Sequence, residues 1–141
     1  MRKLFAIAVI VLALSCGPKT NKTAVKPLYE ILTVQNDGGA NIQFYEILNE
    51  AKEIKMLLND EHLKRKIKSE DTATANFIIL NMGEKPTSGY SITIDSVEET
   101  ADEVIFKVKE KAPDEGTMSA QVITHPYTIV KVNSKKQIVI K

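Results

Sequence analysis

Cys16 is the residue whose chemistry can be read most directly, because it is the only cysteine of the chain. It follows an uninterrupted apolar run, Leu4 to Leu14, which comes directly after the basic residues Arg2 and Lys3. A positive start and a short apolar run are typical of a secretory signal peptide, whereas a membrane-spanning helix needs about 20 apolar residues. A lone cysteine cannot close an internal disulfide in an exported protein, which leaves lipid attachment as the best account of its thiol.

The tetrapeptide Ala13-Leu14-Ser15-Cys16 resembles the bacterial lipobox. This resemblance implies that residues 1–15 are removed as a signal peptide and that the Cys16 sulfur and the new amine are acylated, with palmitate as a suitable label. We therefore expect a lipoprotein of the bacterial cell envelope, anchored to a membrane through Cys16 on its periplasmic or surface side. The alternative is an ordinary secreted protein with a stray cysteine in its signal peptide.

The residues behind the cysteine indicate a tether and then one domain. Residues 16–27 hold the lipidated cysteine and a polar stretch with Pro18 and Pro27 at its ends, which cannot build a core and predicts a flexible segment. Residues 28–141 suffice for a single globular domain and not for two.

The charge of the predicted mature chain argues against a nucleic-acid partner. Loss of Arg2 and Lys3 leaves two fewer than the 19 basic residues of the full chain, against 18 acidic ones, so the protein is near neutral. Lys64-Arg65-Lys66 with Lys68 is the one basic cluster, and it is typical of a solvated helix face. Phosphate binding needs a basic patch, which this chain lacks.

No catalytic constellation is visible in the sequence. The two histidines, His62 and His125, stand at no metal-ligand spacing from another histidine, cysteine or carboxylate. The chain also lacks a G-x-S-x-G nucleophile elbow and a Gly-rich phosphate loop. We expect no catalytic residue, no metal and no cofactor.

The first half of the domain predicts a hairpin followed by a helix. Residues 28–34 and 41–46 are rich in strand formers and flank Asn36-Asp37-Gly38-Gly39, a strong turn signal. Apolar residues then recur every three or four positions over about residues 47–66. This spacing predicts one helix, or two short helices broken near Asn59-Asp60, followed by a polar loop over residues 68–74.

The second half predicts short strands throughout. Phe77-Ile78-Ile79-Leu80 is typical of a strand that is buried on both faces. Further alternating or apolar runs cover residues 75–82, 90–97, 103–109, 117–124, 127–132 and 137–141. The pattern predicts a mainly β (α+β) domain, an antiparallel sandwich or open barrel with one helix packed on the sheet.

Three turn motifs in this half of the domain carry a resemblance to a known protein family. They are the turn Pro86-Thr87-Ser88-Gly89-Tyr90, then Ala112-Pro113 with Gly116, and then His125-Pro126-Tyr127. In this order they resemble the C-terminal domain of the PrcB-like protease-complex subunits, over about residues 77–133. The resemblance implies a lipoprotein accessory subunit that binds or stabilises an envelope protease.

The same turn is similar to the Pro-Thr-Thr-Gly-Tyr turn of the chagasin-type cysteine-protease inhibitors, which are Ig-like sandwiches. The chain has no tryptophan, which such inhibitors use, so this likeness implies a loop-presenting architecture rather than inhibition. We expect the segments 87–90 and 125–127 to form neighbouring parts of one exposed recognition edge, with Tyr90 mostly buried and with Thr87, Ser88 and His125 at the surface. The hypothetical partner-binding residues are Pro86, Thr87, Ser88, Gly89, Tyr90, Gly116, His125, Pro126 and Tyr127.

Each motif also has a purely structural explanation. Pro86 fixes φ, Gly89 permits a positive φ, and Pro126 marks a strand start, a bulge or an edge. Two functions therefore stay open. One is a non-catalytic protein-binding lipoprotein with a protease partner. The other is a small-ligand or structural envelope lipoprotein without one, which an apolar pocket under the helix would favour.

Overall fold

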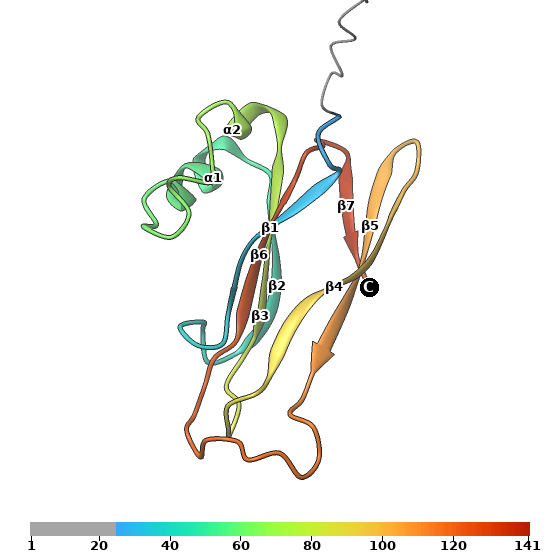
Figure 1. Cartoon of the computed structure of the whole chain (residues 1–141). Coiled ribbons are helices and arrows are strands. Elements are labelled where there is room, and N and C mark those ends of the chain that lie inside the picture. Colours follow the sequence, from blue (N-terminus) through green and yellow to red (C-terminus); the bar gives the residue numbers. More distant parts are fainter. Residues whose placement is uncertain (1–24) are drawn as a thin grey trace, which may run out of the picture.

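The structure is a computed structural model that describes residues 25–141. The predicted signal peptide, Cys16 and the tether up to residue 24 lie outside the described residues. Within residues 25–141 the chain forms the strands and helices seen in Figure 1. They are β1 (Tyr29–Gln35), β2 (Gln43–Leu48), α1 (Ala51–Leu57), α2 (Asp71–Thr74), β3 (Asn76–Met82), β4 (Ser91–Glu99), β5 (Glu103–Lys111), β6 (Tyr127–Val132) and β7 (Gln137–Ile140).

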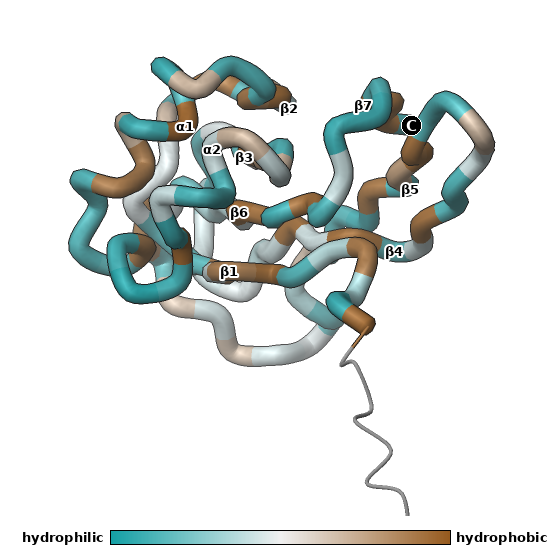
Figure 2. Tube along the Cα trace, turned by 90° about the horizontal axis from the view of Figure 1, so that it is seen from above, coloured by the Kyte–Doolittle hydropathy of each residue, from teal (hydrophilic) through white to brown (hydrophobic). Residues whose placement is uncertain are grey.

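Two sheets face each other as a sandwich. The four-stranded sheet has the order β1-β6-β3-β2 and is antiparallel throughout, whereas the three-stranded sheet, β4-β5-β7, contains one parallel pair, β5 with β7. Figure 2 shows the helices on the outer face of the four-stranded sheet, opposite the layer of β4, β5 and β7. The prediction of a mainly β single domain is confirmed, and both sheets are open rather than closed into a barrel.

Strand β3 lies at the centre because both of its faces are apolar. Ile78 and Leu80 pack between the two sheets, and Phe77 packs on the opposite side against residues 51–74, which comprise α1, α2 and the turns between them and which we call the helical segment. All three side chains are fully buried. The burial on both faces that the apolar run predicts is therefore confirmed.

The core between the sheets follows from the two-residue period of the strands. Ile92 and Ile94 of β4 meet Val104 and Phe106 of β5, and the rings of Tyr29 and Phe106 make an edge-on contact at 5.7 Å. The other fully or nearly buried members of this core are Ile78, Leu80, Met82, Val130, Val132 and Ile138.

Helix α1 is shorter than the helix predicted over residues 47–66, because it begins later and ends earlier. Ile47 and Leu48 belong to β2, since they pair with Ile78 and Phe77 of β3. Helix α1 ends at Leu57, and the chain continues through turns to residue 66. These turns still bury Leu63 and Ile67 against the sheet, which accounts for the helical spacing of the sequence.

Two strand predictions are wrong. β1 and β2 form no hairpin, because β6 and β3 lie between them and the two strands stand at opposite edges of the four-stranded sheet. Residues 117–124 form no strand, because their apolar side chains point outward and only Thr124 makes a bridge, to Lys85. The predicted polar loop also contains α2, whose Asp71 is buried.

Asp71 belongs to a buried ion pair that joins α2 to the four-stranded sheet. The Lys131 Nζ lies 2.8 Å from Asp71 Oδ1, and both side chains are almost inaccessible. Burial by itself raises the pKa of the Asp71 carboxyl, but hydrogen bonds from Lys131 and the Lys68 backbone N–H, with the Lys131 charge, hold that pKa below its ordinary value.

We expect Asp71→Ala to lower the free energy of unfolding by about 3–5 kcal/mol, because it leaves the Lys131 ammonium buried without its counter-ion. Urea denaturation at neutral pH measures this change. The double variant Asp71→Ala, Lys131→Met should recover much of the loss, since no buried charge remains.

The loss of stability at acid pH gives a second test of the Asp71–Lys131 pair. A lowered pKa means that the pair stabilises the fold fully above the ordinary aspartate value of 3.8, and that this contribution is lost as the pH falls toward the lower pKa of the folded state. The double variant should lose less stability than the wild type over this range. A single variant within about 1 kcal/mol of the wild type would contradict the assignment.

Candidate functional site

Two loops meet at the end of the sandwich that lies opposite the helices. They are residues 83–90, between β3 and β4, and residues 112–126, between β5 and β6, and together we call them the loop end (Figure 1). The Lys85 N–H donates to the Thr124 carbonyl at 2.8 Å, and the Thr124 N–H donates to the Lys85 carbonyl at 3.0 Å. The two segments that carry the predicted motifs are therefore neighbours.

Thr87 and Ser88 hold the loop end together. The Ser88 N–H donates to the Ala120 carbonyl at 3.1 Å, and the Ala120 N–H donates to the Ser88 Oγ at 2.9 Å. The Thr87 carbonyl accepts a hydrogen bond of 3.0 Å from the Thr124 hydroxyl. Both residues are half-buried, and Ser88 takes part through its backbone and its hydroxyl, whereas Thr87 takes part through its backbone carbonyl.

Gly89 is required by its conformation and by its surroundings. Its φ is +95°, and a Cβ at this position would lie 2.9 Å from the Cβ of Pro113. Gly116 also has a positive φ, +80°, but nothing lies within 4 Å of the place of its missing Cβ. Pro86 is exposed at the start of the turn.

The two tyrosines of the motifs lie on opposite faces of the four-stranded sheet. Tyr90 packs at the edge of the core between the sheets, with the Lys85 Nζ 5.8 Å from its ring centre. Tyr127 packs against the core under the helical segment. Pro126 is buried, and its carbonyl accepts the Met82 N–H at 2.9 Å. Tyr90 and Tyr127 therefore do not share one surface.

His125 joins three separate loops. Its N–H donates to Asp37 Oδ1 at 2.9 Å, its Nδ1 lies 3.1 Å from the same oxygen, and its Nε2 lies 4.0 Å from Glu84 Oε2. The His125 carbonyl accepts the Gly39 N–H at 2.9 Å. The pKa of Asp37 is lowered, chiefly by the hydrogen bond with the His125 side chain and then by hydrogen bonds with the backbone of Gly38 and His125.

The loop between β5 and β6 also exposes apolar side chains that sequence reasoning placed in a strand. Met118, Val122 and Ile123 all project into solvent. A loop of this length without helix or strand is usually functional, and exposed apolar groups mark interaction sites. The signal available in the sequence was the lack of strict alternation over residues 117–124.

A second feature lies on the outer face of the four-stranded sheet, below the helical segment. It is a hollow of about 280 Å³. Most of its wall is apolar, and Asp60 and Asn81 add polar groups. The lining residues are Gly38, Gly39, Ala40, Phe44, Leu57, Asp60, Ile79, Asn81, Tyr127 and Ile129. Of these, only Tyr127 is among the residues that the sequence singled out for partner binding.

Residues 25–141 contain no cluster of three or more histidine, cysteine or acidic side chains arranged to hold a metal ion. No helix in this part of the chain has the length and apolar character needed to cross a membrane.

The family comparison covers both loops of the loop end. Residues 76–133 match the PrcB C-terminal family. The resemblance that the three turn motifs carry is confirmed, and we call residues 76–133 the PrcB segment. It runs from β3 to the residue after β6, so β1, β2, β7 and both helices of the described chain lie outside it.

The curated proteins add a partial relative. The uncharacterized protein MJ1373 of Methanocaldococcus jannaschii is 39% identical over 56 residues, which are 40% of this chain and 33% of that protein. The chain thus spans about a third of the length of this relative. No solved structure matches the chain.

We expect Gly89→Ala in the PrcB segment to destabilise the protein by about 1–3 kcal/mol, because the new methyl group meets Pro113 and the backbone keeps a left-handed φ. Gly116→Ala is the matched control, since it has the same conformational cost and open space around it. Urea denaturation of both variants isolates the contact with Pro113. Equal losses would mean that Pro113 can move away.

Proposed function

We propose that this protein is an exported, non-catalytic lipoprotein of the bacterial cell envelope that binds and stabilises an envelope protease through its loop end. Two observations on the sequence support the proposal: the lipobox-like segment at Cys16, and the PrcB segment, whose resemblance to PrcB-like protease-complex subunits implies a protease partner.

The observation that carries the proposal is the position of the loop end relative to the start of the domain. Leu28 and Asn133 are bonded through the Asn133 N–H and the Leu28 carbonyl at 2.8 Å, and Tyr29 pairs with Val132 at the end of β6. The loop end precedes the start of β6 at Tyr127. Strands rise about 3.3 Å per residue, so the full length of β6 separates the two ends (Figure 1).

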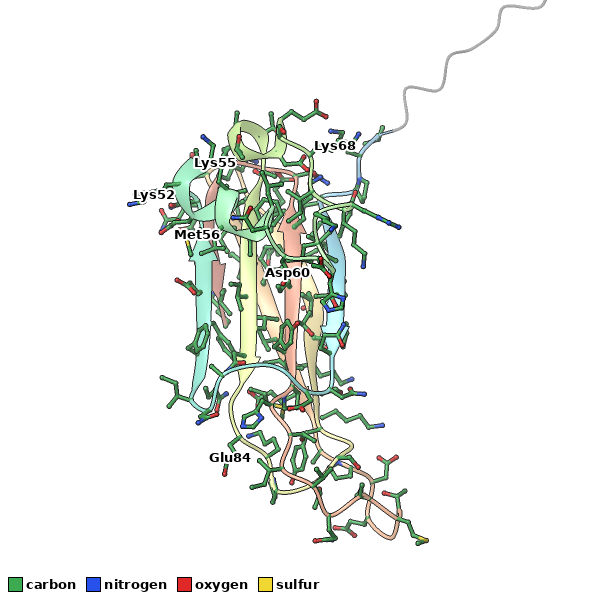
Figure 3. The ribbon with its side chains drawn as sticks, turned by 90° about the vertical axis from the view of Figure 1, so that its left-hand side faces the viewer. Lys52, Lys55, Met56, Asp60, Lys68 and Glu84 are labelled. Carbon is green, nitrogen blue, oxygen red and sulfur yellow. The ribbon has the colours of Figure 1, made fainter. Side chains whose placement is uncertain are left out.

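A lipid on Cys16 would therefore be attached to the helical end of the domain and would leave the loop end on the side remote from the point of attachment. Figure 3 shows this polarity, with Lys52, Lys55 and Met56 at the helical end and Glu84 at the other. A surface remote from the point of attachment is accessible to a folded partner.

The loop end also has the physical properties of a binding surface. Its internal hydrogen bonds hold the loops before any partner arrives, which reduces the entropy lost on binding. Met118, Val122 and Ile123 provide the exposed apolar area of the loop end. Thr87 and Ser88 take part in the hydrogen bonds that hold the loops.

A small-ligand-binding envelope lipoprotein is the second candidate. The hollow under the helical segment favours it, because preformed apolar pockets with a few polar groups are typical of small-molecule sites.

We expect Cys16→Ser to abolish labelling with palmitate and to leave an uncleaved or soluble precursor, because thioether formation needs the sulfur. The wild-type chain should take up label and partition into detergent. Metabolic labelling of both chains in a bacterial host measures the difference. Equal labelling would contradict lipid attachment at this residue.

We expect the double variant Met118→Lys, Ile123→Lys to lose partner capture and keep its stability, because both side chains are exposed and contact no core. Co-purification from cross-linked membranes, with the captured protease identified by mass spectrometry, measures binding. Met56→Lys is the control, since Met56 is also an exposed apolar residue and lies at the opposite end. Undiminished capture by the folded double variant would exclude the loop end as the binding surface.

A further inference from the structure

The hollow is enclosed by parts of the chain that are far apart in sequence. Its floor is the outer face of the four-stranded sheet, to which β2, β3 and β6 contribute apolar side chains. Leu57 and Asp60, at the end of α1 and in the turns behind it, close one side. The turn at residues 38–40 closes the other. Figure 3 shows Asp60 over the sheet, between the helical end and the loop end.

The turn that borders the hollow is fixed by Asn81. The Asn81 Oδ1 accepts the Ala40 N–H at 2.9 Å, and its Nδ2 donates to the carbonyls of Ala40 at 2.9 Å and Ile42 at 2.6 Å. Gly39 lies so close that a Cβ on it would stand 2.2 Å from the Asn81 Oδ1. The hollow is therefore preformed, as small-molecule sites usually are.

Asp60 gives the hollow a negative charge. Its Oδ1 accepts the His62 N–H at 2.7 Å, and among residues 25–141 its carboxylate takes part in no ion pair. Burial and then the Asp60 charge raise the pKa of Tyr127, which places the carboxylate and the phenol in one electrostatic environment. An apolar floor beside a carboxylate without a counter-ion is complementary to a cation with an apolar body.

We infer that the hollow binds a small organic cation, an amine whose apolar body lies on Phe44, Ile79 and Ile129 and whose ammonium group pairs with Asp60. The Tyr127 ring adds a cation–π contact on the same side. A volume of about 280 Å³ limits the ligand to about the size of one substituted ring. This site is separate from the loop end, and its ligand is independent of any protease partner.

Three probes of similar shape test the charge. Phenethylammonium, phenethyl alcohol and phenylacetate are titrated by calorimetry into the full lipoprotein in detergent, with blanks of detergent alone. We expect the cation to bind, the neutral alcohol to bind at least about tenfold more weakly, and the anion not to bind, because only the ammonium group can form a charged hydrogen bond with the Asp60 carboxylate. Equal binding of all three, or of none, would overturn the inference.

Three variants locate the site. Asp60→Asn keeps an acceptor for the His62 N–H and should weaken the cation about tenfold while changing the alcohol little. Ala40→Trp places a ring in the hollow from an exposed position and should remove both probes. Asp95→Asn, an exposed acid on the other sheet, should change neither. An unchanged affinity of the cation for Asp60→Asn or Ala40→Trp would show binding elsewhere and refute the site.

Discussion

The burial of β3 on both faces is the constraint on which the other elements depend. Phe77 and Ile78 are adjacent in sequence and fully buried, so apolar layers must cover both sides of the strand. The three-stranded sheet covers one side and the helical segment covers the other. β6 and β2 must also flank β3, because its backbone needs hydrogen-bonding partners on both edges. The helical segment covers only part of the outer face, and the hollow is the part that it leaves open.

This constraint explains which features of the fold the sequence predicts. Apolar alternation identifies β4 and β5 and the faces they bury, since the two-residue period is a local property. Pairing is not local. The turn at Gly38 forms as expected, with a φ of +100°, yet the strands on its two sides lie at opposite edges of the sheet. A short turn signal cannot reveal that β3 and β6, which come later in the chain, lie between them.

The candidate sites also divide into features that can be read locally and features that depend on how distant segments pair. The sequence predicts the neighbouring loops of the PrcB segment, because their proline and glycine positions are conformational signals that can be read locally. It does not tell which of their side chains are free. The Ser88 and His125 side chains hold the loops together, as does the Thr87 carbonyl, whereas the exposed apolar side chains belong to residues 117–124, which the sequence predicts as a strand. The hollow has no local signal at all, since Phe44, Asp60 and Tyr127 meet only through the sheet order.

The hollow and the loop end share one hydrogen-bonded unit. Gly39 lines the hollow and donates to the His125 carbonyl, while His125 also binds Asp37. A change that loosens this turn is therefore felt at both sites, and its effect cannot be assigned to either function. Asp60 and Met118 make none of these contacts. Substitutions at such outlying positions separate ligand binding from partner binding, and any thermodynamic coupling between the two sites must be equal in both directions.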